Sequence, residues 1–273
     1  MSFHYRSGNF HSMKIDNKVV VITGASEGIG AACASAFASR GALLSLTARS
    51  GQRLEEAGGR DALVTPGDLR EERTRAALVD RTLDRYGRID ILINNAGVGL
   101  YQPAHGGDLA SVRAMFELNI FAPLDLIQKV VPHMKKTGSG AIINVGSIGG
   151  KITLPWFTLY SATKYALGSI TDGLRMELRR EGIHAMTVCP GYVKTGFQRH
   201  VLAGRPPDLS GLGSKWAISP KQCAEDIARG LERNARTVVS PKSGWLLIAL
   251  ARMFPATFDS RLEKIYWEQQ AKR

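Results

Sequence analysis

The chain has 273 residues, of which 44% are hydrophobic and 22% charged, and its formal net charge is +12. This composition excludes intrinsic disorder, and three scattered cysteines exclude a disulfide scaffold and favour a reducing, cytoplasmic location. The basic residues are spread along the chain without interleaved aromatic residues, so we predict no nucleic-acid binding. With no CxxC pair in the sequence, we predict no metal site either.

Residues 1–14 form a polar tail that lacks the apolar core of a signal peptide. From residue 15 to 243, short runs rich in Val, Ile and Leu alternate with longer segments of helical period. This alternation predicts a single α/β domain of the doubly wound Rossmann type, with a seven-stranded parallel sheet and helices on both faces. The predicted strands are 18–23, 42–47, 62–65, 89–94, 141–146, 185–189 and 236–240. The predicted helices are 28–40, 70–86, 109–137, 159–181 and 220–234.

Three further segments complete this organisation. Pro123 lies in the longest predicted helix and indicates a bend there. Residues 196–219 contain several glycines and prolines, so we predict a substrate loop or lid. Residues 244–273 form an apolar, helical C-terminal extension whose most apolar stretch is too short to span a bilayer.

The first predicted strand is followed by glycines in a GxxxGxG pattern and then by an apolar helix. Such glycines let the backbone approach a pyrophosphate, and the free N–H groups at the start of the helix favour its negative charge. The alternative is an ordinary glycine-rich turn, but the position between a strand and a helix favours a dinucleotide site. Its predicted members are Gly24, Ser26, Glu27, Gly28, Ile29 and Gly30.

Tyr160 and Lys164 are four residues apart in a predicted helix, so their side chains share a face. An ammonium near a phenol favours the phenolate, and we expect Lys164 to lower the pKa of Tyr160 for use as a general acid and base. Ser147 follows a predicted strand at the sheet edge where ligands bind, and its hydroxyl suits a substrate oxygen that gains negative charge. The alternative is that Tyr160 and Lys164 have this spacing by accident. The position of Ser147 at the same sheet edge argues against this alternative.

Several motifs occur in a fixed order between residues 18 and 240. They are TGASEGIG at 23–30, Asp68-Leu69, Asn94-Asn95-Ala96-Gly97, Ser147, Tyr160-Ser-Ala-Thr-Lys164 and Pro190-Gly191. This arrangement resembles the short-chain dehydrogenases/reductases, in their compact single-domain type. The Thr-Ala-Arg-Ser run at 47–50 and the C-terminal extension are more distantly similar to the branch of hydroxysteroid dehydrogenases and their bacterial relatives.

The resemblance implies a role for each matching position. Asp68, followed by Leu69, would hold the adenine amino group, and Lys164 would bind the nicotinamide ribose as well as assist Tyr160. Asn119 would hold a water beside Lys164 that completes a proton path, although an amide bonded to backbone is the alternative. The remaining implied cofactor contacts are Asn95, Ala96 and Gly97 at the adenosine ribose, and Pro190, Gly191, Val193 and Thr195 toward the nicotinamide.

The second predicted strand ends in Ala48 and Arg49, where an enzyme that prefers NAD usually carries an acidic residue. The guanidinium of Arg49, next to Ser50, would pair with a 2′-phosphate, so we expect NADP(H) to be preferred over NAD(H). A solvated loop cation is the alternative for Arg49. Glu27 argues against this preference, since an acid beside phosphates is unfavourable.

We expect hydride transfer between the cofactor and a carbonyl or secondary alcohol, with Asn119, Ser147, Tyr160 and Lys164 as the catalytic set. The expected substrate contacts are mostly apolar and indicate a lipophilic small molecule. They are Ser147, Tyr160, Leu100, Gly149, Trp156 and Tyr192, with Val98, Gly99, Ile148, Pro155 and Phe157 as further walls.

Other interpretations stay open at this point. A non-catalytic NADP sensor on the same fold is the main alternative, and an epimerase or dehydratase is a smaller one. We expect a homodimer or homotetramer. The apolar residues of 244–258 suit packing on the domain or on a second subunit, or peripheral contact with a membrane.

Overall fold

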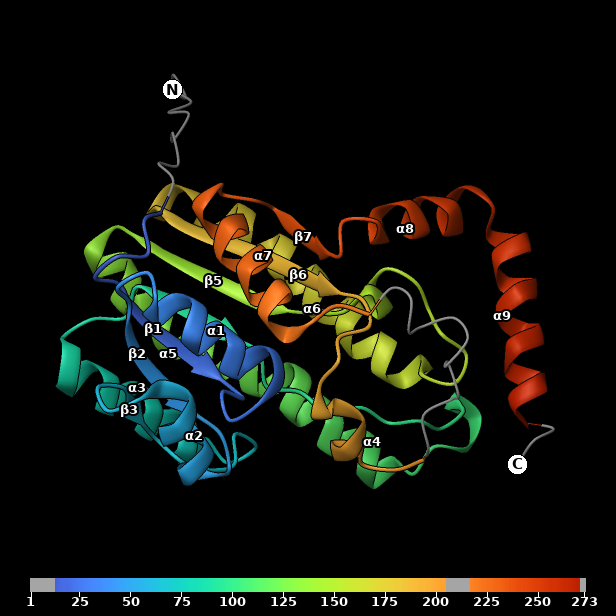
Figure 1. Ribbon diagram of the computed structural model, residues 1–273, viewed down its shortest axis with the longest axis horizontal. Coiled ribbons are helices and arrows are strands. Elements are labelled where there is room, and N and C mark those ends of the chain that lie inside the picture. Colours follow the sequence, from blue (N-terminus) through green and yellow to red (C-terminus); the bar gives the residue numbers. More distant parts are fainter. Residues whose placement is uncertain (1–12, 205–216, 271–273) are drawn as a thin grey trace, which may run out of the picture.

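The computed structural model describes residues 13–204 and 217–270, and places seven strands in one parallel sheet (Figure 1). The strand order is β3-β2-β1-β4-β5-β6-β7, so the winding direction reverses between β1 and β4. The strands are β1 (Val19–Thr23), β2 (Leu43–Thr47), β3 (Leu63–Val64), β4 (Ile91–Asn94), β5 (Gly140–Val145), β6 (Ile183–Pro190) and β7 (Thr237–Ser240). The predicted seven-stranded parallel sheet is confirmed.

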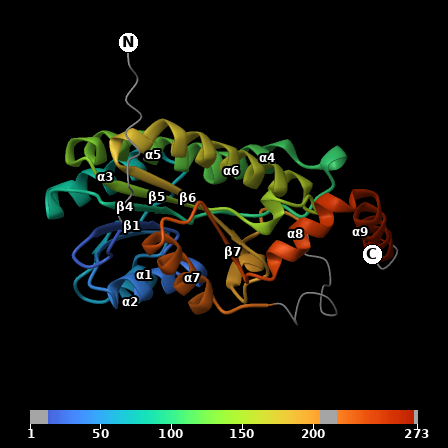
Figure 2. The same ribbon diagram turned by 90° about the horizontal axis from the view of Figure 1, so that it is seen from above.

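Helices cover both faces of this sheet (Figure 2). One face carries α3, α4, α5 and α6, and the other carries α1, α2 and α7, while α8 and α9 lie beyond one end of the sheet. The helices are α1 (Gly28–Ala38), α2 (Gly51–Gly58), α3 (Glu72–Tyr86), α4 (Leu109–Phe116), α5 (Ala122–Thr137), α6 (Thr158–Leu178), α7 (Pro220–Glu232), α8 (Gly244–Met253) and α9 (Pro255–Gln270). The predicted doubly wound architecture is therefore confirmed.

The core follows from the alternation of side chains along the strands. Val20 and Ile22 of β1 pack with Phe37 of α1, whereas Val21, between them, packs on the other face with Leu126 of α5. All five residues of β1 are buried, because both faces of the strand are covered. This burial explains why the strands appear in the sequence as continuous apolar runs.

The predicted long helix 109–137 is divided in the structure. Between α4 and α5, residues 117–121 form a π-helical segment, and Pro123 occupies the first turn of α5. The three segments follow one another without a break, so Pro123 lies within a continuous helical stretch, where its missing N–H removes one backbone hydrogen bond. The π-helical irregularity ends two residues before Pro123, and the bend expected at this proline stays a prediction. Helix α2 is also present without having been predicted.

The C-terminal extension consists of α8 and α9, joined by Phe254. No helix in the described part of the chain is long and apolar enough to cross a membrane. Most of the predicted polar tail, residues 1–12, lies outside the described residues, as do residues 205–216 of the predicted substrate loop.

Candidate active site

A cavity of about 580 Å³ opens at the carboxyl ends of the central strands. Residues from the turns after four of these strands line it: Gly24 after β1, Asn95 after β4, Ser147 after β5 and Gly191 after β6. The cavity therefore lies at the switch point between β1 and β4, where doubly wound sheets bind their ligands.

The glycine-rich turn after β1 fits a bound diphosphate. Gly24 has a φ of +64°, and a Cβ there would lie 2.9 Å from the Cα of Ala96. A Cβ on Gly30 would lie 2.2 Å from the carbonyl oxygen of Gly24, so neither position admits a side chain. Helix α1 begins here without a side-chain cap, which leaves its first N–H groups open to the cavity.

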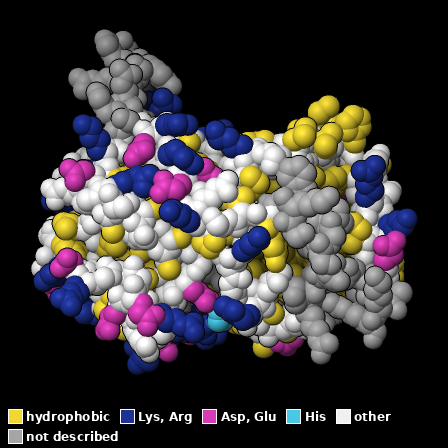
Figure 3. Space-filling view, in the orientation of Figure 1, with side chains coloured by type: hydrophobic (Ala, Val, Ile, Leu, Met, Phe, Trp, Pro, Cys, Tyr) yellow, Lys and Arg dark blue, Asp and Glu magenta, His cyan; other side chains and the backbone are white. Residues whose placement is uncertain are grey.

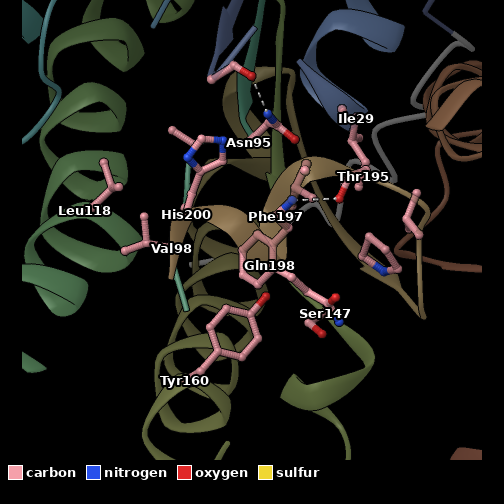
Figure 4. A pocket seen from close by; sticks show the side chains of 18 of the residues that line it. Ile29, Asn95, Val98, Leu118, Ser147, Tyr160, Thr195, Phe197, Gln198 and His200 are labelled. Atoms are coloured by element: carbon pink, nitrogen blue, oxygen red, sulfur yellow. Dashed lines mark hydrogen bonds between the residues drawn. The ribbon is translucent and has the colours of Figure 1, made fainter. Parts of the chain in front are cut away.

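Asn95 holds this turn against the end of β4. Its side-chain amide donates to the carbonyl oxygens of Thr23, at 2.9 Å, and Gly24, at 3.1 Å. Figure 4 draws one of these bonds at the Asn95 side chain. The amide of neighbouring Asn94 instead donates to Asn144 on β5, at 2.9 Å. Asn95 thus fixes the shape of the cofactor end, while Asn94 ties two strands together.

Glu27, which argued against phosphate binding, lies among two arginines and a histidine in the structure. It lies 2.5 Å from His200, 3.6 Å from Arg53 and 3.8 Å from Arg199. His200 and Arg199 belong to a 3-10 helix, Gly196–His200, that passes over the cavity mouth. Arg53 and Arg199 therefore offset the charge of Glu27, and no pattern in the sequence identifies them as its partners.

A second cluster of charges lines the far end of the cavity, where β2 and β3 end. Arg49, Arg53, Asp68 and Arg70 all contribute to its wall. Nε of Arg70 lies 3.1 Å and 3.0 Å from the two carboxylate oxygens of Asp68, and this hydrogen bonding lowers the pKa of Asp68. Asp68, expected to hold an adenine amino group, is thus engaged by Arg70 here. Arg53 and Arg70 are additional basic residues that sequence reasoning missed.

Tyr160 and Lys164 point from α6 toward the same part of the cavity. The Lys164 ammonium donates to the carbonyl oxygen of Val145, at 3.0 Å, and lies 5.5 Å from the centre of the Tyr160 ring. Burial lowers the pKa of Lys164 to about 8. With this lowered pKa, the Lys164 ammonium releases its proton more easily than an exposed lysine does.

Burial raises the pKa of Tyr160, and hydrogen bonding with Ser147 opposes this rise without cancelling it. The expectation that Lys164 lowers this pKa is therefore wrong, since burial of the phenol dominates and raises it. Ser147 also accepts a hydrogen bond from the N–H of Gly149, at 3.0 Å. Figure 4 shows Tyr160 and Ser147 directed into the same space.

Aromatic rings hold Tyr160 in this orientation. Phe157 stacks on Tyr160 with centroids 4.1 Å apart, and Tyr101 stacks on the other side of Phe157 at 4.3 Å. Phe197, from the 3-10 helix over the mouth, meets the edge of Tyr160 at 5.7 Å (Figure 4). The Tyr160 ring is thus confined between Phe157 on the cavity wall and Phe197 of the 3-10 helix.

Asn119 lies in the π-helical segment and is fully buried. Its side-chain oxygen accepts from the N–H of Val98, and its amide donates to the carbonyl oxygen of Val98, at 3.0 Å, and to Thr163 of α6, at 3.1 Å. A Cβ on Gly97 would lie 3.1 Å from the side-chain oxygen of Asn119 and 3.4 Å from Nζ of Lys164. The Asn119 side chain therefore joins the cavity wall to α6, with its polar atoms already bonded.

Most of the predicted site residues line this one cavity. Five do not: Gly30, Gly99, Leu100 and Asn119 are buried behind its wall, and the half-buried Pro155 also lies outside the lining. The cofactor-side residues brought together are Gly24, Ser26, Glu27, Gly28, Ile29, Arg49, Ser50, Asp68, Leu69, Asn95, Ala96, Gly97, Pro190, Gly191, Val193 and Thr195. On the other side are Ser147, Gly149, Trp156, Tyr160, Lys164 and Tyr192.

Some lining residues carried no sequence signal for a site. Tyr101, Leu154 and Leu247 are apolar or aromatic positions in loops or helices, distant from one another in the sequence. Leu247 comes from α8, so the C-terminal extension contributes to the cavity wall.

Comparison with known proteins agrees with this geometry. A family model described as short chain dehydrogenase matches residues 18–205. A curated relative, the 11-beta-hydroxysteroid dehydrogenase-like 4A of Arabidopsis thaliana, is 31% identical over 92% of this chain and 85% of its own length. This relative agrees with the expected similarity to the branch of hydroxysteroid dehydrogenases.

Two solved structures are also similar. A short chain dehydrogenase from Burkholderia cenocepacia in complex with NADP is 28% identical, with a TM-score of 0.77 over 92% of this chain and 99% of that one. A 3-ketoacyl-(acyl-carrier-protein) reductase from Brucella melitensis with NADH is 27% identical, with a TM-score of 0.75 over 83% and 97%. The chain therefore belongs to the short-chain dehydrogenase family, oxidoreductases that use a nicotinamide cofactor and act on CH–OH groups or the corresponding carbonyls.

Proposed function

We propose that this protein is an NADP(H)-dependent oxidoreductase that interconverts a carbonyl and a secondary alcohol on a lipophilic small molecule. The observation that carries the proposal is the meeting of Tyr160, Ser147 and Lys164 in one cavity with the glycine-rich turn after β1. Tyr160 and Lys164 share α6, whereas Ser147 follows β5 and the glycine-rich turn follows β1, so the fold brings three parts of the chain together.

The cavity residues near the ends of β1 and β2 suit a dinucleotide that carries an additional 2′-phosphate. The turn at Gly24 and the open start of α1 suit the diphosphate, as the absence of room for a Cβ indicates. Arg49, with Arg53 and Arg70 nearby, supplies positive charge where a 2′-phosphate would lie. When bound, the nicotinamide cofactor supplies or accepts the hydride.

The protein's own residues manage the substrate oxygen and its proton. In the reducing direction Tyr160 donates a proton to the carbonyl oxygen, and Ser147 stabilises the negative charge developing on that oxygen. A buried phenol with a raised pKa keeps its proton at neutral pH, which suits an acid in this step. Alcohol oxidation uses the same groups in reverse.

Lys164 and Asn119 support this step in different ways. The low pKa of Lys164, about 8, lets its ammonium release a proton toward Tyr160 and recover it from solvent. Asn119, whose side chain is bonded to Val98 and Thr163, acts as a positioning residue that holds the wall beside Lys164. We therefore place Asn119 behind the reacting groups instead of in contact with substrate.

The substrate end of the cavity favours an apolar molecule. Its walls combine aliphatic and aromatic side chains, with Ser147 and Tyr160 as the polar groups that face the reacting oxygen. The apolar members are Val98, Tyr101, Ile148, Leu154, Trp156, Phe157, Phe197, Leu202 and Leu247. Ketoacyl and hydroxysteroid compounds, named for its relatives, belong to this chemical class.

A panel of carbonyl compounds assayed by the loss of NADPH absorbance tests the proposal. The panel should contain flat polycyclic ketones, long-chain ketones and 3-ketoacyl esters, with small polar ketones as the comparison. We expect turnover with the lipophilic members and little with the polar ones. Tight NADPH binding without turnover on any member would favour the sensor interpretation instead.

A further inference from the structure

We propose that the outer face of α8 docks this protein onto an anionic lipid surface, beside the mouth of the active-site cavity. The proposal goes beyond the oxidoreductase activity and rests on which side chains α8 buries and which it presents. It needs no membrane-spanning helix, because an amphipathic helix can lie in the plane of a bilayer interface.

The inner side of the C-terminal extension is firmly anchored. Ile248 of α8 is 2% exposed and packs with Ile152, Cys189 and Val239. Farther along, Ile265 and Tyr266 of α9 pack against the aromatic cluster beside the cavity. The extension is therefore part of the folded body and holds α8 in a fixed orientation.

The outer side of α8 is apolar and uncovered in the described part of the chain. Leu246, Leu250 and Met253 follow one another at helical spacing and are 65%, 43% and 67% exposed. Trp245 and Phe254 flank them, at 46% and 54%. Figure 3 shows the corresponding cluster of hydrophobic side chains at the α8 end of the molecule. Such a concentration of exposed large side chains marks an interaction surface.

The positive charge of the segment around α8 favours an anionic lipid surface as the partner of this face. The segment 242–258 contains two basic residues, Lys242 and Arg252, and no acidic residue, and the whole chain has a net charge of +12. A second copy of the chain would bring this basic segment against itself in a two-fold contact, with no acid within it to pair. An anionic bilayer instead offers hydrocarbon for the apolar stripe and negative headgroups for the basic flanks.

The position of the stripe also connects it to the cavity. Leu247, on the same helix, lines the cavity and is 44% exposed, and the lining residues Tyr192 and Leu202 are also exposed, at 40% and 36%. The cavity mouth and the apolar face therefore adjoin. Docking through α8 places the mouth close to the lipid, where an apolar substrate would concentrate.

Sedimentation of the full chain with lipid vesicles tests the docking directly, without using turnover. The probes are vesicles of phosphatidylcholine alone and of phosphatidylcholine mixed equally with phosphatidylglycerol. We expect the protein to pellet with the mixed vesicles and much less with the neutral ones, and high salt to release part of it.

Matched variants locate the surface. The double change Leu246→Glu with Met253→Glu should lower the vesicle partition coefficient at least about tenfold, because it places two charges in the apolar stripe. Met176→Glu, at a 76% exposed methionine on α6, should leave binding unchanged. Lys242→Gln with Arg252→Gln should remove most of the preference for anionic over neutral vesicles. All these side chains are exposed, so circular dichroism should show the native fold for each variant.

Three results would overturn the proposal. The wild type could stay in the supernatant with both kinds of vesicle, or the Leu246→Glu with Met253→Glu variant could pellet like the wild type. Light scattering without lipid could also show that these two changes convert a dimer into a monomer, which would assign the face to a second copy of the chain.

Discussion

The ring of Phe157 lies almost flat on the ring of Tyr160, with centroids 4.1 Å apart and planes inclined by 19°. Phe157 is only 7% exposed, so it serves both the packing of the cavity wall and the orientation of the phenol. Replacing Phe157 therefore tests the orientation of Tyr160 while the hydroxyl group of Tyr160 is kept.

Phe157→Ala should lower the free energy of unfolding by about 3–5 kcal/mol, since it leaves a cavity in place of a buried ring. It should also lower kcat roughly tenfold, because the phenol loses its fixed orientation. Urea unfolding and steady-state kinetics measure the two effects. Phe121→Ala removes an equal ring at a 54% exposed position and should show neither. Normal kcat in a folded Phe157→Ala protein would contradict the positioning role.

Arg49→Asp should raise the KM for NADPH by roughly 10- to 100-fold, the range expected for losing a charge-assisted hydrogen bond to a phosphate. The KM for NADH should change much less, because NADH lacks that phosphate. Arg180→Asp, an exposed change in the turn before β6, is the charge-matched control. Equal changes for both cofactors would remove the basis for an NADP preference.

Lys164 makes stability depend on pH in a definite direction. Its pKa is about 8 in the folded protein and 10.5 when unperturbed, so between these values the unfolded chain binds the additional proton. Stability from this group therefore rises with pH across that window, by about 3 kcal/mol in total. Subtracting the unfolding free energies of Lys164→Met from those of the wild type isolates this contribution. A difference that stays level or falls from pH 8 to 10.5 would show that burial does not lower this pKa.

Asn119→Leu removes the partners of both the N–H and the carbonyl of Val98, which lie in the wall of the cavity. Each group left unpaired costs about 1–3 kcal/mol, so chemical denaturation should show a clear loss of stability. If Asn119 only positions the wall, Asn119→Leu should lower kcat while the pH profile of kcat keeps its shape. A shifted pH profile would instead place Asn119 in the proton path.

The sheet and much of the site could be predicted from the sequence, for identifiable reasons. Strands such as β1 and β5 are buried on both faces, so their apolar runs are visible without any structure. Gly24, Ser147 and Tyr160 carry signals in their spacing and in their position relative to strands. Because parallel strands end at one edge, predicting the strands also placed these residues together.

Other features depend on contacts that no local pattern reveals. Phe157 meets Tyr101 only after folding. Glu27 meets His200 because the 3-10 helix Gly196–His200 lies beside it, and it meets Arg53 because α2 does. The π-helical segment at 117–121 could not be predicted, because its apolar residues continue the pattern of the flanking helices. The raised pKa of Tyr160 likewise follows from burial, which spacing alone cannot measure.

The most direct test of the central claim, that Tyr160 exchanges the proton with the substrate oxygen, is the turnover of Tyr160→Phe on the best carbonyl substrate. This change keeps the ring that stacks on Phe157 and removes only the hydroxyl. We predict that NADPH binding, followed by fluorescence titration, stays near the wild-type value while kcat falls roughly 100- to 10,000-fold. A folded Tyr160→Phe protein that turns over close to the wild-type rate would contradict the account.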